Sequence, residues 1–382
     1  MTAALLLLLA AAAQGDTGSF VLRNFRFASG EVLPELRIHY RTLGQPRRDA
    51  AHVVRNAVLI LHGTGGSGQQ FLSPLFAGEL YGPGQPLDTT THYLILPDNV
   101  GHGRSSKPSD GLHARFPRYR YEDMVAAQYR LVRDGLHVNH LSLVMGTSMG
   151  CMHSWLWAER YPDAMDGVVP LACLPTQIAG RNRMWRRMLS AGIRSDPDWR
   201  SGEYTSEPPS LRAALELLFV AGSSPLQLQR AAPTRDSADA YVARWLETRL
   251  ADTDANDLVY QVEASADYDP SPDLERVAVP VLAINSADDF INPPELGLME
   301  RLIRRVKQGR YVLIPISDTT RGHGTHTVAA AWKAYFAPFV ASLERAQPAP
   351  PGGQPGHRSR RASTAGRQRE VPAASGSRLP AG

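Results

Sequence analysis

The chain has 382 residues, 43% of them hydrophobic, which is enough to bury a substantial core in one large domain or in a domain with an insertion. Its net charge of +4 comes from the end of the chain: residues 346–382 hold six arginines and one glutamate, and the rest carries about −1. This excludes a basic face for nucleic acid outside the tail, and two cysteines exclude a disulfide framework or a cysteine-rich metal site.

The chain opens on an apolar run of leucine and alanine at residues 5–13, followed by Gln14. The run is too short for a membrane-spanning helix, which needs about 20 residues. We predict an export signal over residues 1–15, and hence a periplasmic or secreted protein with no stable membrane span. Because no Lys or Arg precedes the run, a different start codon or a flexible Ala-rich leader stays as the alternative.

Short apolar β-like runs alternate with helical stretches along residues 16–345, which is typical of a mostly parallel sheet flanked by helices. Residues 20–27 and 36–42 predict an antiparallel hairpin. Near-continuously apolar strands, as expected where both faces are covered, are predicted at 57–61, 92–96, 141–145, 167–172, 279–284 and 310–314. Helices are predicted at 121–136, 150–160, 295–307 and 327–345.

The alternation lapses between about residues 175 and 275, where helical segments at 181–188 and 211–220 are clearest. We predict a helical lid over 176–275, inserted between core parts at 16–175 and 276–345. Tail residues 346–382, rich in Pro, Gly, Ser and Ala, are predicted to be disordered. Four large lid side chains either line an acyl site or pack in a core: Met184, Trp185, Met188 and Trp199.

The motif Gly146-Thr147-Ser148-Met149-Gly150 directly follows the predicted strand at 141–145. A strand that breaks into a Gly-flanked turn before a helix can hold one serine exposed, as a nucleophile elbow does. The helix that follows points its positive end toward Ser148. Ser148 is therefore the candidate nucleophile.

A serine hydroxyl needs a base, and the base needs a partner that fixes its tautomer. Asp288 and Asp289 follow the strand at 279–284, and His323 and His326 follow the strand ending at 314. These loops converge at the carboxyl edge of an open parallel sheet. We favour His323, because it follows a glycine in a loop, over His326, which caps or packs against the last helix. This chemistry needs no cofactor and no metal.

The developing oxyanion needs backbone N–H donors, for which we expect Met149 and Thr64. Residues 63–68 also match G-x-G-x-x-G, so a nicotinamide-dependent oxidoreductase is the rival from another class. The acid that should bind the ribose is misplaced, because Asp88 precedes the next strand and Asp98 lies too far along the chain. Asp98 and His102 have no third metal ligand nearby, which favours a structural turn.

Both cysteines are predicted to be small buried packing residues. Cys151 lies in the first turn after the elbow, and Cys173 ends an apolar strand. A single bridge between them is the less favoured alternative, since it requires an oxidising compartment.

With these residues in place, the chain resembles the α/β-hydrolase superfamily over about residues 20–345, and the D-N-x-G-H-G-x-S loop at 98–105 is similar to a recurrent feature of that superfamily. The resemblance implies an α/β-hydrolase fold, and its chain order of Ser, Asp and His matches this sequence. The spacing of Asp289 from Pro293 resembles the superfamily's acid loop, so we favour Asp289 over Asp288.

Within the superfamily, segments 116–128 and 195–204 are similar to homoserine O-acetyltransferase-like proteins. The elbow departs from that group: it reads G-T-S-M-G-C-M-H instead of the usual G-G-S-M-G-G-M-Q, and Gly324 replaces the aspartate of G-H-D. The His62-Gly63 turn resembles an ordinary esterase. We therefore expect hydrolysis of a small-molecule ester through an acyl-enzyme on Ser148, with acyl transfer to an alcohol such as homoserine as the alternative.

Overall fold

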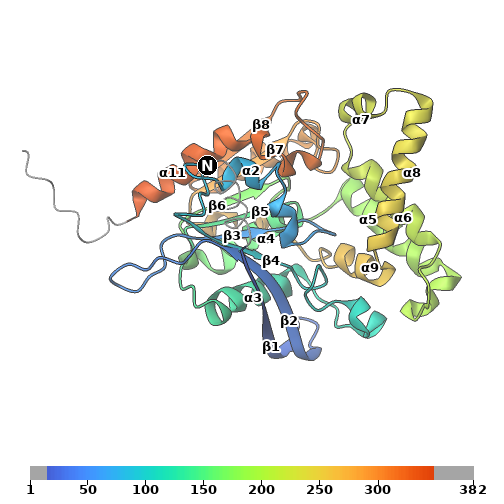
Figure 1. Ribbon diagram of the computed structural model, residues 1–382, viewed down its shortest axis with the longest axis horizontal. Coiled ribbons are helices and arrows are strands. Elements are labelled where there is room, and N and C mark those ends of the chain that lie inside the picture. The colour runs from blue at the N-terminus through green and yellow to red at the C-terminus, as the bar shows by residue number, and fades with distance from the viewer. Residues whose placement is uncertain (1–14, 348–382) are drawn as a thin grey trace, which may run out of the picture. The chain divides into compact units, whose positions relative to one another are not determined.

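The computed structural model describes residues 15–347 (Figure 1). The predicted export signal, apart from residue 15, and the predicted disordered tail beyond residue 347 lie outside the described residues. Within the described range, no helix combines the length and apolar character that a bilayer crossing requires.

An eight-stranded sheet forms the centre of the molecule, in the order β1-β2-β4-β3-β5-β6-β7-β8. β1, β2 and β4 pair antiparallel, and all the later neighbours pair parallel. Its strands are β1 (Asp16–Arg26), β2 (Val32–Leu43), β3 (Ala57–Leu61), β4 (Tyr93–Pro97), β5 (Leu143–Thr147), β6 (Val168–Leu171), β7 (Val281–Ser286) and β8 (Gly309–Ile314). The predicted mostly parallel sheet is thereby confirmed.

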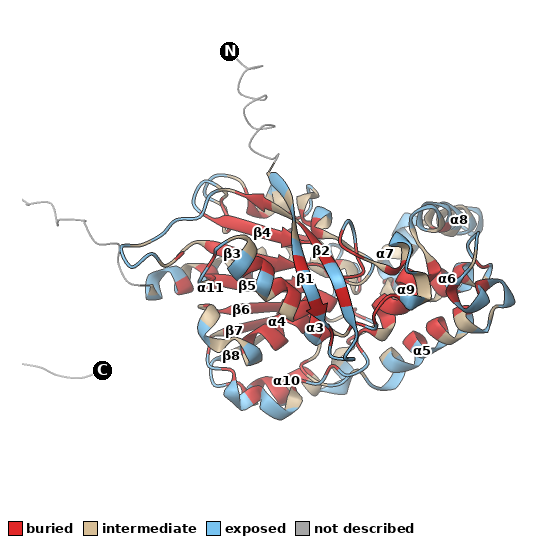
Figure 2. Ribbon diagram, turned by 90° about the horizontal axis from the view of Figure 1, so that it is seen from below, coloured by how far each residue is buried: buried red, intermediate tan, exposed pale blue. Residues whose placement is uncertain are grey.

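The inner strands of the sheet are buried because helices cover both faces of the sheet (Figure 2). Every residue of β3, β4 and β5 is buried, whereas β1 is mostly exposed and β2 mixes exposed with buried residues. β5 extends two residues beyond the predicted end at Met145, so it runs directly into the elbow.

The helices are α2 (Ala77–Leu80), α3 (Tyr121–Arg130), α4 (Met149–Arg160), α5 (Gly180–Ser195), α6 (Ser210–Gly222), α7 (Pro225–Ala231), α8 (Arg235–Asp252), α9 (Ala255–Glu263), α10 (Leu298–Leu302) and α11 (Lys333–Ala346). Three predicted helices are wrong in extent. The one at 181–188 is too short, because α5 continues to Ser195. The one at 295–307 is broken, because Gly297 adopts φ +57 between a 3-10 turn and α10. The last one starts at Lys333, after two 3-10 turns.

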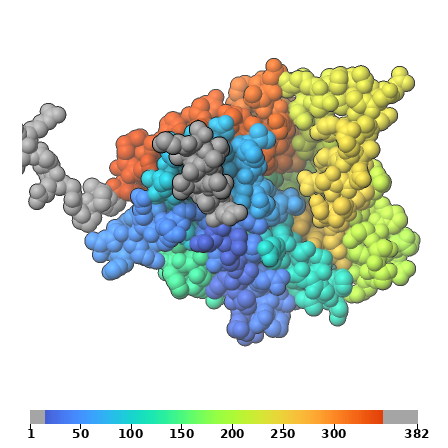
Figure 3. Space-filling view, in the orientation of Figure 1, coloured from blue at the N-terminus to red at the C-terminus, as the bar shows by residue number. Residues whose placement is uncertain are grey.

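Helices α5 to α9 lie between β6 and β7 in the chain and form one end of the molecule in the space-filling view (Figure 3). They bury an apolar cluster of their own, separate from the two clusters packed against the sheet. Trp185 and Trp199 belong to this cluster, while Met184 and Met188 are exposed. Of the two uses that the sequence leaves open, both tryptophans thus serve core packing.

Candidate active site

Ser148 occupies the turn between β5 and α4 with φ 54 and ψ −109, a backbone conformation that non-glycine residues rarely adopt. The flanking glycines make the turn sterically feasible. A Cβ on Gly150 would lie 2.0 Å from the Leu61 carbonyl oxygen, and one on Gly146 would lie 2.1 Å from the Gly150 carbonyl oxygen. The predicted elbow geometry therefore depends on both glycines.

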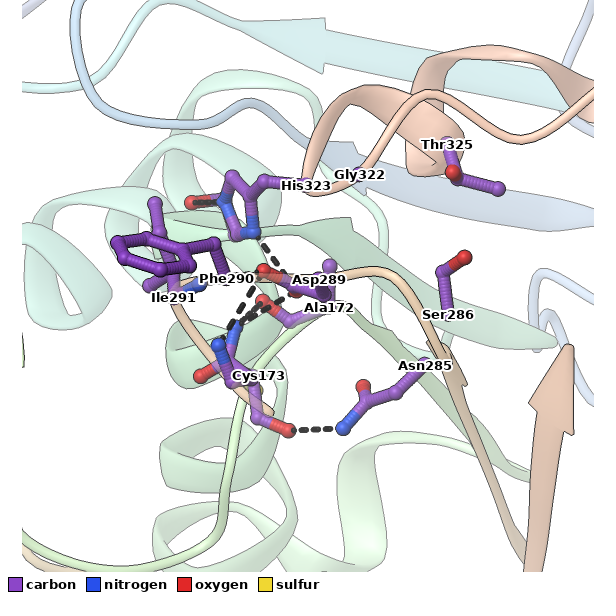
Figure 4. Close-up of polar contacts among 12 residues, drawn as sticks. Ala172, Cys173, Asn285, Ser286, Asp289, Phe290, Ile291, Gly322, His323 and Thr325 are labelled. Atoms are coloured by element: carbon purple, nitrogen blue, oxygen red, sulfur yellow. Dashed lines mark hydrogen bonds and ion pairs between the residues drawn. The ribbon is translucent and has the colours of Figure 1, made fainter. Parts of the chain in front are cut away.

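The structure brings Ser148, His323 and Asp289 together from three loops at the carboxyl edge of the sheet. The Oγ of Ser148 lies 2.8 Å from Nε2 of His323. On the other side of the ring, Nδ1 of His323 lies 2.9 Å from Oδ2 of Asp289, a contact that Figure 4 shows. If Nδ1 carries the ring hydrogen and donates it to the carboxylate, Nε2 is free to accept the serine proton.

Asp289 is 2% exposed, and its carboxylate accepts hydrogen bonds from the backbone N–H of Ile291 at 2.8 Å and from Nδ2 of Asn292 at 3.1 Å. Burial by itself would raise the pKa of Asp289, but the charge of His323 and these hydrogen bonds outweigh it and lower the pKa below its ordinary value. Asp289 thus stays ionised beside the imidazole.

The two residues left as alternatives have other contacts. Asp288 accepts hydrogen bonds from Ser224 Oγ at 3.0 Å and from the Gly322 N–H at 2.9 Å, so it links the start of α7 to the loop that carries His323. The His326 ring packs edge-on against His323 with 5.2 Å between centroids, and burial lowers the pKa of His326 to about 3. Within the described residues, neither is hydrogen-bonded to Ser148.

The candidate oxyanion donors flank the nucleophile. Met149 begins α4 immediately after Ser148, and a Cβ placed on Gly63, next to Thr64, would lie 3.2 Å from the Ser148 Cβ. Among the hydrogen bonds of residues 15–347, neither the Met149 nor the Thr64 N–H has an acceptor. Two N–H groups beside the serine are therefore free to bind a substrate oxygen.

The glycine-rich loop does not have the form of a dinucleotide site. It leads into a short 3-10 helix, Gly68–Leu72, and the Gly68 N–H donates to Oδ1 of Asp98 at 2.8 Å. Asp98 also lies 3.0 Å from Nδ1 of His39 and accepts from the Arg104 N–H at 2.9 Å. Asp98 therefore fastens the 98–105 turn to its neighbours.

A buried polar network behind the oxyanion loop was not predicted. Nδ1 of His62 lies 2.8 Å from the Gly63 carbonyl oxygen, and Nε2 accepts the Asn99 N–H at 2.9 Å. Gln128 contacts Asn99 and lies 3.0 Å from Nδ1 of His153. The signal in the sequence that could have indicated this network is a polar residue on the apolar side of each helix, Gln128 in α3 and His153 in α4.

Cys151 and Cys173 are buried as predicted, but the preference for unbridged cysteines is wrong, because they form a disulfide with 5.9 Å between their Cα atoms. β5 and β6 are neighbouring strands, so the first turn of α4 lies next to the end of β6. The carbonyl of Cys173 also accepts Nδ2 of Asn285 at 3.1 Å, which ties β6 to β7 (Figure 4). The bridge thus fastens the serine turn to the strands beside it.

A cavity of about 790 Å³ lies over these residues. Ser148, His323 and Met152 belong to its lining on the sheet side. Helices α5 and α7 contribute the opposite side, including Arg186 and Leu226. Residues 15–347 contain no group of three or more His, Cys, Asp and Glu side chains suited to a metal ion.

Residues 56–315 match the protein-family model described as alpha/beta hydrolase fold. The chain therefore belongs to the α/β-hydrolase family. It is 29% identical to a "Probable acyltransferase" of Methanothermobacter thermautotrophicus, over 80% of this chain and 91% of that one. It is also 29% identical to a homoserine O-acetyltransferase of Pelobacter propionicus, over 78% of this chain and 89% of that one.

A solved structure, an acetylester hydrolase from Corynebacterium glutamicum, superposes with a TM-score of 0.74 at 22% identity, covering 87% of this chain and 97% of the other. At that identity the likeness shows the fold. Together with the relatives, it makes the protein an α/β-fold hydrolase or a related O-acyltransferase of the homoserine O-acetyltransferase-like branch.

Proposed function

We propose that the protein is a serine hydrolase that cleaves a small-molecule carboxylic ester through an acyl-enzyme on Ser148. The observation that carries this proposal is the hydrogen-bonded series from Ser148 through His323 to Asp289, at 2.8 and 2.9 Å, at the wall of a cavity. An arrangement of this kind converts an unreactive hydroxyl into a nucleophile at neutral pH.

In the proposed reaction, His323 Nε2 takes the proton as Ser148 Oγ attacks the ester carbonyl. The carbonyl oxygen gains negative charge and accepts hydrogen bonds from the Met149 and Thr64 N–H groups. His323 then gives its proton to the leaving alcohol, and the C–O bond breaks. Water, deprotonated by the same imidazole, attacks the acyl-enzyme; the bond from the acyl carbon to Ser148 Oγ breaks, His323 returns the proton to that oxygen, and the acid is released. Asp289 stabilises the imidazolium in both steps.

Labelling with a fluorophosphonate tests the nucleophile directly. Intact mass should increase by one phosphonyl group on Ser148, and Ser148→Ala should lose both the label and its turnover of aryl esters, the latter by about 10⁴-fold or more. Full aryl ester turnover by the Ser148→Ala variant would refute the proposal.

Acyl transfer to an alcohol is the second candidate, favoured by the relatives named homoserine O-acetyltransferase. Both reactions share the acyl-enzyme and differ in whether water or an alcohol attacks it. The elbow sequence and the G-H-G loop, which depart from that group, favour water. Acetyl-CoA with homoserine distinguishes the two, because transfer releases free thiol and forms an O-acetyl product, while hydrolysis leaves homoserine unchanged.

We also propose that the protein is exported. The apolar run at residues 5–13 and the Cys151–Cys173 bridge support this, since disulfides persist in oxidising compartments. Expression of the full chain followed by fractionation and N-terminal mass analysis tests it. Export predicts a shortened N-terminus outside the cytoplasm, and an intact leader on cytoplasmic protein would contradict it.

A further inference from the structure

Arg186, on the inner face of α5, is the buried charged group of the cavity lining that the triad leaves unexplained. Arg181 and Glu295 also line the cavity, but both are exposed. The Arg186 side chain is 3% exposed and lines the same cavity as Ser148. Burying a guanidinium is costly unless an anion compensates its charge. No ion pair among residues 15–347 includes it, whereas Arg194 on the same helix pairs with Glu263 at 2.8 Å.

Neutral partners use only part of its hydrogen-bonding capacity. Nε donates to Oδ1 of Asn182 at 2.9 Å, and Nη1 donates to the Ser265 hydroxyl at 3.3 Å. The guanidinium carbon lies 4.7 Å from the centroid of the Trp185 ring, and the Tyr121 hydroxyl is a further polar neighbour. By distance, Nη2 donates to none of the described residues, and it is not among the buried polar atoms sealed from solvent. Its N–H groups are therefore available to a molecule in the cavity.

Arg186 also lies near the oxyanion loop. Burial raises the pKa of Tyr121, while the charge of Arg186 and the polar side chains of Ser265 and Thr64 oppose that rise, so Tyr121 has both Arg186 and Thr64 as neighbours. Because Ser148 and Arg186 also line one cavity, an ester that reacts at Ser148 occupies the same space as the guanidinium.

We propose that Arg186 binds a carboxylate of the substrate, so that the preferred ester carries a free carboxylate on its acyl or its alcohol part. This deepens the proposed function and rests on it. A single guanidinium whose donors are partly used matches one monoanionic carboxylate better than a dianionic phosphate, which would keep uncompensated charge. The nearby Asp288 and Asp289 carboxylates are held by their own donors.

Matched ester pairs test the proposal. For the acyl side, p-nitrophenyl hydrogen adipate and suberate are compared with their neutral methyl esters; these chains are long enough to avoid anhydride closure. For the alcohol side, 3-acetoxybenzoate is compared with its methyl ester. In at least one arm, kcat/KM should be higher for the carboxylate by about 10- to 100-fold, the worth of a charge-assisted hydrogen bond.

Arg186→Met should lower that ratio toward one, and Arg186→Lys should keep part of it. Arg187→Met is the matched control, because Arg187 is exposed on the same helix, is absent from the cavity lining and changes the charge equally. Wild-type protein that prefers the neutral ester in both arms, or an Arg186→Met variant that keeps the wild-type ratio, would overturn the proposal.

A binding measurement on an inactive protein tests the proposal even if the Arg186→Met variant does not fold. Calorimetry should show that adipate binds to the Ser148→Ala protein. Adding Arg187→Met to this protein should leave the affinity for adipate unchanged, and adding Arg186→Lys should lower it. Equal affinity in all three would overturn the assignment. Because adipate binding needs no nucleophile, its failure is distinguishable from failure of the hydrolase itself, which fluorophosphonate labelling reports.

Discussion

At Ser148, a residue that normally avoids positive φ is held at φ 54 by hydrogen bonds to β6 and α4. Its N–H donates to the Leu171 carbonyl at 2.9 Å, and its carbonyl accepts the Met152 N–H at 3.1 Å. A conformation of this kind costs about 1–3 kcal/mol, which the surrounding packing must offset. In return, the hydroxyl faces the cavity and the imidazole.

The two adjacent aspartates should respond differently to the same substitution. Asp289→Asn keeps the volume but removes the charge that stabilises the imidazolium and its tautomer, so kcat should fall by about 10³- to 10⁴-fold. Steady-state hydrolysis of a neutral aryl ester measures this. A loss at Asp288→Asn equal to or larger than that at Asp289→Asn would contradict the assignment.

Sequence reasoning could select Ser148, His323 and Asp289 because each role follows from a local pattern after a strand. It could not select Arg186, since an arginine in an Arg-rich helical segment has no local sign of being buried. The contacts of Asp288 with Ser224 and Gly322 join three distant segments, and only the assembled fold brings them within hydrogen-bonding distance.

Between elements, Asp288 connects the start of α7 to the loop that presents His323. Asp288→Asn keeps one acceptor oxygen and loses the charge, so we expect about tenfold lower kcat, through misplacement of the imidazole, and faster amide exchange in residues 317–327. Asp239→Asn is the control, because Asp239 is exposed on α8 and takes part in no ion pair or side-chain hydrogen bond among residues 15–347. Unchanged exchange in Asp288→Asn would argue against this role.

The disulfide should stabilise the junction of α4 and β6. Bridging cysteines 22 residues apart is worth about 3 kcal/mol in chain-entropy accounting. The double variant Cys151→Ala/Cys173→Ala should lower the free energy of unfolding by about that amount in a urea titration. An unchanged midpoint and slope would show that the bridge contributes nothing. Fluorophosphonate labelling of the folded variant reports whether the serine turn survives.

Strands were easier to predict than helices, for a physical reason. The inner strands are buried on both faces, so their apolar runs are unbroken, while α8 has a single fully buried residue, Leu246, and shows no apolar stripe. The disulfide was misjudged because its formation depends on β5 and β6 being neighbours, a fact of sheet order that cysteine spacing does not encode.

For the whole molecule, buried neutral histidines predict sensitivity to acid. Burial lowers the pKa of His153 from 6.5 to about 3, so unfolded chains take up a proton there that folded ones exclude. The contribution of neutral His153 to the free energy of unfolding is fully present above pH 6.5. It is lost as the pH falls from 6.5 toward 3, by about 1.4 kcal/mol per pH unit.

Urea unfolding between about pH 6 and pH 4 measures this dependence. His153→Gln, which keeps an acceptor for Gln128, should reduce the slope of unfolding free energy against pH by about 1.4 kcal/mol per unit. His137→Asn is the control, because His137 is exposed and asparagine tolerates its φ of 54. Equal slopes in wild type and His153→Gln would refute the attribution.

The separate apolar cluster of helices α5 to α9 has an evolutionary consequence. The segment is inserted in the chain between the adjacent strands β6 and β7 and buries a cluster of its own, with only α9 also packing in a sheet cluster through Tyr260. Helices α5 to α8 can therefore diverge or be exchanged together while the reactive serine keeps its support. Selectivity and chemistry are then inherited separately. Grafting this segment from a relative should transfer preference for esters in one recombination event.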